Sequence, residues 1–344
     1  MAVYYHPSCS LHRIPDHPEC HSRVDGIMAT LRKNMSDRLI FKEAKRVTEK
    51  EILLFHTPGL VQRFQKLADK ALQSYQKKKT VDYLSIDMDT TVMWQTRPAA
   101  FYAAGSVISA LDSMYADIDS SERIDTAFCC VRPPGHHAER NTAGGFCFLN
   151  NVGIGARYAQ KTYGVERVAI LDFDVHHGNG TEEGFTSDPS VFYGSTHGKD
   201  HFPGTGHDPS PLVGDKAAKE LDRRIVNRLL TPGPESRAEF KWCEILSEME
   251  RFQPQLVIMS TGFDAHDDDP LADCELQDED YHWVTAQILV SCGRITAALS
   301  RPVRYLSVLE GGYDICAIQR SALCHVEAML EGVPDVPVQS AVAE

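Results

Sequence analysis

The sequence lacks the features that mark a membrane, secreted or nucleic-acid-binding protein. No apolar run is long enough to cross a bilayer, and the N-terminus has no charged segment followed by an apolar one. Lys and Arg are also scarce, 35 residues against 48 Asp and Glu, which gives a formal net charge of -13. With no cationic surplus to neutralise phosphates, general binding to nucleic acid is not expected. We therefore expect an intracellular soluble protein, in the cytoplasm, the nucleus or both.

Cysteine pairs with metal-site spacing, internal repeats and low-complexity linkers are absent as well. The ten cysteines are scattered without a CxxC motif, so neither a thiolate zinc site nor a disulfide framework is predicted. No composition shift marks a domain boundary, and we expect residues 1–344 to form one domain. The acidic surplus would suit a basic substrate, although solubility alone also explains it.

Four short apolar runs read as buried strands, and each is followed directly by polar, glycine-rich sequence. Amphipathic stretches of helical length lie between them, including 151–163, 237–251 and 281–300. This alternation predicts an α/β fold with a largely parallel sheet, whose ligand crevice lies outside the carboxyl ends of the strands. The residues that follow the four runs should therefore meet. The runs are 126–131, 168–171, 256–260 and 303–309.

Acidic residues and histidines follow these runs at suggestive spacings. In the segment 172–176, the strand period of two places Asp172, Asp174 and His176 on one side. Two carboxylates on one face repel each other and need a cation. Asp264, after the third run, could complete a three-ligand set with an open fourth position, which is typical of a catalytic zinc site. Oxygen and nitrogen ligands without sulfur also admit iron or manganese.

The other strand ends supply groups for proton transfer. Water activated by a metal could attack a carbonyl while His136 or His137 takes its proton, and Tyr313 could donate to the oxyanion. The adjacent histidines could instead form a second metal site, and Tyr313 could be a buried tyrosine with a satisfied hydroxyl. The Gly311-Gly312 pair favours a functional turn, because two glycines let the backbone approach a ligand closely.

Six motifs in this order resemble the zinc-dependent histone deacetylase family, and within it the class II branch together with the bacterial deacetylase-like amidohydrolases. The likeness runs from about residue 5 through the helix expected after Tyr313. It implies an arginase-like three-layer α/β/α fold with a central eight-stranded parallel sheet, and it makes residues 1–344 a single deacetylase catalytic domain. The motifs are RPPGHH (132–137), GGFCFLNN (144–151), DFDVHHGNG (172–180), FPGTG (202–206), GFDAH (262–266) and LEGGY (309–313).

The resemblance also implies roles for individual residues. Zinc would be held by Asp174, His176 and Asp264, with His137 as general base and acid and Tyr313 as the electrophilic donor. His136 would be the electrostatic partner of His137. The resemblance pairs Asp172 with His136 and Asn179 with His137. An Asn beside the base, as in class II members, raises its pKa less than a carboxylate would and keeps it neutral.

A narrow substrate tunnel and two potassium sites are implied in the same way. Phe146 and Phe202 match the aromatic tunnel walls, and the carbonyl of Gly145 would face the substrate amide nitrogen. The inner potassium set is Asp172, Asp174, His176, Ser195 and Thr196, and the outer set is Phe185, Asp188 and Val191.

Two residues bear on the substrate. Tyr313 is retained where weakly active class IIa members carry His, and Leu271 stands where polyamine-specific members place Glu. We therefore expect zinc-dependent hydrolysis of Nε-acetyl-lysine in proteins, with release of acetate and a role in chromatin regulation. The alternatives are an amidohydrolase for acetylpolyamines or other small molecules, and a non-catalytic acetyl-lysine binding scaffold. The predicted partner is an acetylated protein or peptide, without nucleic acid or membrane, and the oligomeric state stays open.

Overall fold

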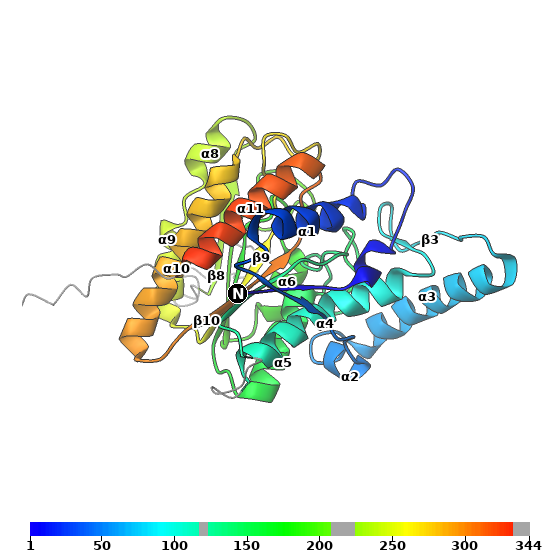
Figure 1. Cartoon of the computed structure of the whole chain (residues 1–344), viewed down its shortest axis with the longest axis horizontal. Coiled ribbons are helices and arrows are strands. Elements are labelled where there is room, and N and C mark those ends of the chain that lie inside the picture. Colours follow the sequence, from blue (N-terminus) through cyan, green and yellow to red (C-terminus); the bar gives the residue numbers. More distant parts are fainter. Residues whose placement is uncertain (117–122, 208–223, 333–344) are drawn as a thin grey trace, which may run out of the picture.

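The computed structural model describes residues 1–116, 123–207 and 224–332, and a parallel sheet of eight strands crosses its centre (Figure 1). All neighbouring strands in this sheet run parallel, in the order β2-β1-β5-β10-β9-β6-β7-β8. The strands are β1 (Ala2–Tyr5), β2 (Ile40–Glu43), β5 (Thr126–Cys129), β6 (Val168–Asp172), β7 (Val191–Gly198), β8 (Ile225–Leu230), β9 (Leu256–Thr261) and β10 (Arg304–Leu309).

The four strands predicted from apolar runs are the four central strands of this sheet. β5, β10, β9 and β6 are neighbours, and every residue of β5, β6 and β9 is buried. The other four strands flank them and escaped prediction. β2 is an edge strand with exposed residues at both ends, and β7 and β8 mix polar residues into their sequences, so neither shows a continuous apolar run.

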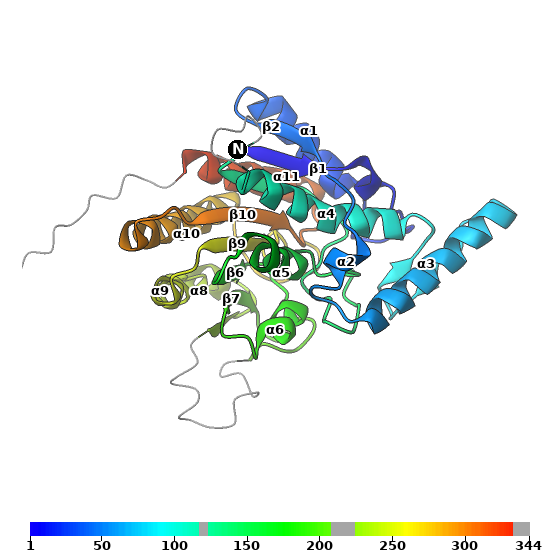
Figure 2. The same cartoon turned by 90° about the horizontal axis from the view of Figure 1, so that it is seen from below.

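Two hydrophobic cores lie on opposite faces of the sheet, which gives the predicted three layers. Along β9, Leu256 and Ile258 join one core, whereas Val257 and Met259 join the other, as the strand period of two requires. Figure 2 shows helices on both sides of the strands. The first core is covered by α2 (Glu49–Ile52), α3 (Pro58–Lys78), α4 (Thr96–Met114), α5 (Asn151–Tyr163) and α6 (Asn179–Phe185), and the second by α1 (Ser22–Met35), α9 (Cys243–Phe252), α10 (Asp278–Leu299) and α11 (Ile315–Glu331).

Four short elements complete the described structure. The 3-10 helix η1 (Pro7–Ser10) follows β1, and α8 (Glu235–Glu239) precedes α9. β3 (Leu84–Ser85) and β4 (Thr91–Val92) pair antiparallel beside the main sheet. Within the described ranges, no helix combines the length and apolar character that crossing a membrane requires.

Two of the three predicted helices are confirmed, and one is wrong as a single helix. The stretches 151–163 and 281–300 correspond to α5 and α10. The stretch 237–251 breaks between α8 and α9, where Phe240 and Trp242 are buried. Trp242 packs edge-on against Phe173, at 6.1 Å between ring centroids. Burying these two rings stabilises the fold more than a continuous helix would, because burial of a large aromatic side chain removes much apolar surface from water.

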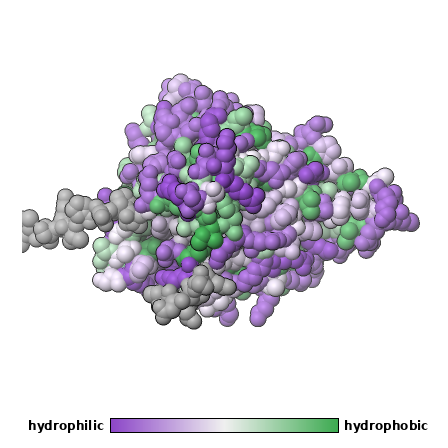
Figure 3. Space-filling view, in the orientation of Figure 1, coloured by the Kyte–Doolittle hydropathy of each residue, from purple (hydrophilic) through white to green (hydrophobic). Residues whose placement is uncertain are grey.

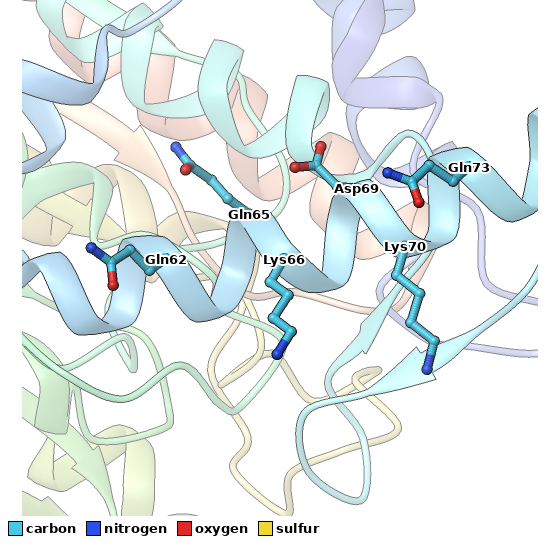
Figure 4. A pocket seen from close by; sticks show the side chains of 6 residues that line it. All are labelled: Gln62, Gln65, Lys66, Asp69, Lys70 and Gln73. Carbon is cyan, nitrogen blue, oxygen red and sulfur yellow. The ribbon is translucent and has the colours of Figure 1, made fainter.

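Helix α3 is amphipathic, and its inner face anchors it to the first core through Leu60, Phe64 and Ala68. The solvent face carries only polar side chains around a surface hollow of about 520 Å³ (Figure 4). Its lining is Gln62, Gln65, Lys66, Asp69, Lys70 and Gln73. Hydrophilic residues also dominate the face of the molecule in Figure 3. This hollow contains none of the predicted site residues.

Candidate active site

The predicted site residues gather at the carboxyl edge of the four central strands. The loop after β6 carries Asp174 and His176, the loop after β9 carries Asp264, and the turn after β10 carries Tyr313. The loop after β5 brings His136 beside them, with its Nε2 3.8 Å from Asp174 Oδ1. This convergence follows from parallel strands, whose carboxyl ends share one edge of the sheet.

Asp174, His176 and Asp264 form a cluster that could hold one metal ion. Their ligand atoms lie within 4.8 Å of one another, and no other such group of three occurs in the described ranges. His176 Nδ1 lies 3.0 Å from Asp264 Oδ2 and 3.2 Å from Asp174 Oδ1. Both aspartates are fully buried, whereas 12% of the His176 side chain is exposed. Two carboxylates and one imidazole around an open side fit a catalytic zinc ion.

Backbone groups orient the two carboxylates. The N–H of Gly311 donates to Asp174 Oδ2 at 2.7 Å, and the N–H of Val175 donates to Asp264 Oδ1 at 2.9 Å. Gly311 lies so close to both aspartates that a Cβ atom there would collide with their oxygens. A glycine is therefore required at this point of the turn.

The electrostatics of the cluster call for a cation. Burial and the charge of Asp174 raise the pKa of Asp264. Burial opposes a charged His176, but hydrogen bonds to Asp174 and Asp264 outweigh it and raise the pKa of that imidazole to about 10. A proton on His176 thus supplies the positive charge that the carboxylates need, and a bound metal would displace it.

The adjacent histidines differ in their partners and in charge. His136 Nδ1 lies 3.0 Å from Asp172 Oδ2. Burial disfavours its charged form, but Asp174 and Asp172 raise the pKa of His136 to about 10. His137 Nδ1 lies 2.8 Å from Asn179 Oδ1, and burial together with the neighbouring imidazoles holds the pKa of His137 well below its usual value. At neutral pH, His136 is therefore charged and His137 is a neutral base.

Aromatic rings surround the approach to this cluster. The Phe202 ring lies edge-on to His137 at 4.9 Å between centroids, and the Phe146 ring lies edge-on to Tyr313 at 5.8 Å. Phe202 is half exposed, so it lies at the entrance. Gly145, with φ +55°, is so close to His137 and Phe202 that a Cβ atom would contact both rings. Gly145, His137 and Phe202 are therefore tightly packed against one another.

Several charged residues near the site were missed in the sequence or left without a role there. Arg23 is fully buried, and its guanidinium donates to the carbonyls of Glu310 and Gly312 and lies 4.9 Å from the Tyr313 ring centroid. Glu310 accepts N–H bonds from Gly135 and His136. Glu139 Oε1 accepts from Asn179 Nδ2 at 3.0 Å. No local pattern connects Arg23 with a turn almost 290 positions later.

The two predicted potassium sets differ in their surroundings. In the inner set, Ser195 pairs with Asp172 across β6 and β7, and Thr196 Oγ1 is buried with no hydrogen-bond partner in the described structure. An oxygen without a partner fits a cation site. In the outer set, Arg224 donates to the Asp188 carbonyl, and Arg157 pairs with the Asp188 carboxylate. The outer set therefore fits a free cation poorly, because guanidinium groups already supply positive charge there.

Comparisons with known proteins agree with this geometry. A sequence model of the histone deacetylase domain matches residues 17–329. Type-2 histone deacetylase 2 of Dictyostelium discoideum is 32% identical over 361 residues, covering 95% of this chain and 20% of that protein. Polyamine deacetylase HDAC10 of Mus musculus is 30% identical over 350 residues, covering 98% of this chain and 49% of that protein. This chain therefore spans between a fifth and a half of the length of these two relatives.

A solved structure extends the likeness to the fold. The crystal structure of the HDA15 HD domain superposes with a TM-score of 0.80 at 30% identity, covering 96% of this chain and 91% of that one. The parallel sheet and the cluster at its carboxyl edge define an arginase-like α/β protein. Within that class, the chain belongs to the histone deacetylase family. Membership supports a deacetylase reaction on an acetylated substrate.

Proposed function

We propose that this chain is a zinc-dependent deacetylase that removes the acetyl group from Nε-acetyl-lysine in proteins, with residues 1–344 as one catalytic domain. The observation that carries the proposal is the convergence of a metal-ligand cluster, a neutral buried imidazole and a tyrosine. Asp174, His176 and Asp264 would hold the zinc, and His137 and Tyr313 lie on loops beside them. When bound there, zinc would act as a Lewis acid toward the acetyl carbonyl and the attacking water.

The side chains around the cluster would handle the protons and the developing charge. His137, neutral at its depressed pKa, would accept the proton of the attacking water and pass it to the departing lysine amine. His136, charged through Asp172, would stabilise negative charge in the site. Burial raises the pKa of Tyr313, so its hydroxyl stays protonated and can donate to the oxyanion.

The two aromatic residues that we expect to line a tunnel support lysine as the substrate side chain. The apolar rings of Phe146 and Phe202 suit a methylene stem, and the carbonyl of Gly145 would accept the amide N–H. Leu271, 37% exposed, offers no charge to a second ammonium group, which favours acetyl-lysine over acetylpolyamine. The likeness to a protein named as a polyamine deacetylase keeps acetylpolyamine as the second candidate. Asn179 beside the base is consistent with a class II enzyme.

We also propose potassium at the inner set, where Thr196 Oγ1 lacks a protein partner. The outer residues Phe185, Asp188 and Val191 are not proposed as a second potassium site, since Arg224 donates to the Asp188 carbonyl. Anomalous scattering from crystals grown with thallium would decide both points, because each bound ion gives its own peak.

The test of the proposed function combines metal analysis with turnover. Zinc-loaded protein should release acetate from an acetyl-lysine peptide, and a chelator should abolish the reaction. Asp264→Asn should lose both stoichiometric zinc and at least about 100-fold in kcat/KM, since one of three metal ligands is weakened. Asp267→Asn, on the exposed side of the same loop, is the matched control. Full activity after chelation and in Asp264→Asn would refute the proposal, and a large preference for acetylspermidine would replace the substrate.

A further inference from the structure

The carboxylate of Asp269 binds three backbone N–H groups from two loops. Its Oδ2 accepts from Tyr313 at 2.6 Å and from Asp314 at 3.3 Å, and its Oδ1 accepts from Leu271 at 3.0 Å. Asp269 is 6% exposed, and it takes part in no ion pair within the described ranges. A buried carboxylate without a cation is unfavourable unless hydrogen bonds satisfy it. The three N–H bonds satisfy it here.

These bonds are not needed to begin the helix that follows. Asp314 is the N-cap of α11, and its own side chain accepts from the N–H groups of Cys316 and Ala317. Asp269 binds instead to the N–H of Tyr313 and of the cap residue itself. The contacts of Asp269 therefore hold the turn that carries Tyr313 and do not serve to begin α11.

Both the carbonyl and the N–H of one peptide unit in this turn form hydrogen bonds with buried side chains. The peptide between Gly312 and Tyr313 presents its carbonyl to Arg23, whose Nε donates at 2.5 Å, and its N–H to Asp269. Gly312 has φ +112°, a conformation that only glycine adopts readily. Because glycine has no Cβ atom, steric contacts of its own do not restrict the backbone to this conformation. Two buried side chains of opposite charge thus fix the orientation of a peptide that the local sequence leaves free.

We propose that Asp269 is a positioning residue for Tyr313, which fixes the turn that carries the phenol and ties it to the backbone of Leu271. This inference rests on the proposed role of Tyr313 in deacetylation. Positioning matters because a displacement of about 1 Å of a reacting group can lower the rate by about 100-fold. Burial and the charge of Asp264 raise the pKa of Asp269 to about 7, and the three bound N–H groups oppose this rise.

The experiment is a double-mutant cycle on kcat with an acetyl-lysine peptide. Asp269→Asn keeps the size of the side chain but turns an NH₂ group toward backbone donors. It should lower kcat by about 10- to 100-fold with KM changed by less than about threefold, as expected when an interaction made in the transition state is lost. Tyr313→Phe should lower kcat by about 100- to 1000-fold. In the Tyr313→Phe background, Asp269→Asn should cost less than about threefold, because groups that act as a unit are not additive.

Controls separate positioning from general damage. Asp268→Asn, at the exposed neighbour that pairs with Arg320, should retain full activity. Zinc content should be unchanged in Asp269→Asn, and the variant should stay folded at the assay temperature although the buried NH₂ group lowers its stability. Should that variant not fold, Asp269→Glu retains the charge but moves it by one methylene, and it enters the same cycle. The inference would be overturned if Asp269→Asn left kcat unchanged. It would also be overturned if Asp269→Asn lowered kcat by the same factor in the Tyr313→Phe background as in the wild type. If Tyr313→Phe itself loses nothing, the proposed function fails instead.

Discussion

Replacing Asn179 by Asp would test whether the neutral partner of His137 sets the pH range of the enzyme. Asn179 Oδ1 lies 2.8 Å from His137 Nδ1 and contributes a hydrogen bond without a charge. The Asp variant keeps the shape and the contact with His137, loses the hydrogen bond that Asn179 donates to Glu139, and adds a negative charge beside the imidazole. An opposite charge at this distance favours the protonated histidine, so the pKa of His137 should rise.

The size of the change follows from the geometry. Unit charges about 4 Å apart interact by about 4 kcal/mol at an effective dielectric constant of 20. One pKa unit corresponds to about 1.4 kcal/mol, so the pKa of His137 should rise by about 1 to 3 units. In the wild type, burial and the neighbouring imidazoles hold this pKa well below 6.5. A base acts only when it is unprotonated, so the acidic limb of the pH profile should move toward neutral pH.

The assay is kcat/KM for an acetyl-lysine peptide between pH 5 and pH 9 with zinc-loaded protein. Below the new limb, Asn179→Asp should lose about tenfold per pH unit, while its plateau at high pH stays within a few-fold of the wild type. Asn141→Asp is the matched control, because this exposed side chain accepts from Thr57 and Arg63 through an oxygen that Asp retains. An acidic limb that stays in place or moves to lower pH would refute the assignment of His137 as the base.

Two further predictions concern the substrate and stability. Leu271→Glu should raise the ratio of kcat/KM for acetylspermidine over an acetyl-lysine peptide by up to about fivefold, since a partly exposed ion pair contributes up to about 1 kcal/mol. Leu271→Gln controls for size, and an equal ratio in both variants would contradict the role of charge. Glu19 is buried and binds Arg132 through both oxygens, at 2.7 and 2.6 Å, and Arg23 at 3.0 Å. Glu19→Gln should therefore lower the free energy of unfolding in urea at pH 7 by about 3–5 kcal/mol, with exposed Glu43→Gln as the control, and a loss below about 1 kcal/mol would count against it. Although burial opposes its charged form, Arg132 and Arg23 lower the pKa of Glu19, so its contribution is complete above the unfolded pKa and is lost as the pH falls through the folded value.

The central strands of the sheet were predictable because a buried parallel strand appears in the sequence as a short continuous apolar run. A continuous apolar run such as 256–260 needs no knowledge of its neighbours to be read as a strand, and α5 shows its amphipathic period over its full length. β2 and β8 carry polar residues suited to the edges of the sheet, and only the register with β1 and β7 identifies them as strands. The break between α8 and α9 was also hidden, since it depends on the packing of Trp242 against Phe173.

The residues that could carry the chemistry are identifiable without the structure, because strand alternation aligns Asp172, Asp174 and His176 and parallel topology brings the strand ends together. Asp264 and Tyr313 followed as candidates at the ends of neighbouring strands, and the family likeness then assigned their roles. How these groups are charged and held depends on the tertiary structure. His136 and His137 are neighbours in the sequence, yet Asp174 and Asp172 make one a cation, whereas burial and the neighbouring imidazoles keep the other neutral. Arg23 and Asp269 bind the same peptide unit although they lie far apart along the chain. The energies of such buried contacts depend on burial and distance, which local sequence does not encode.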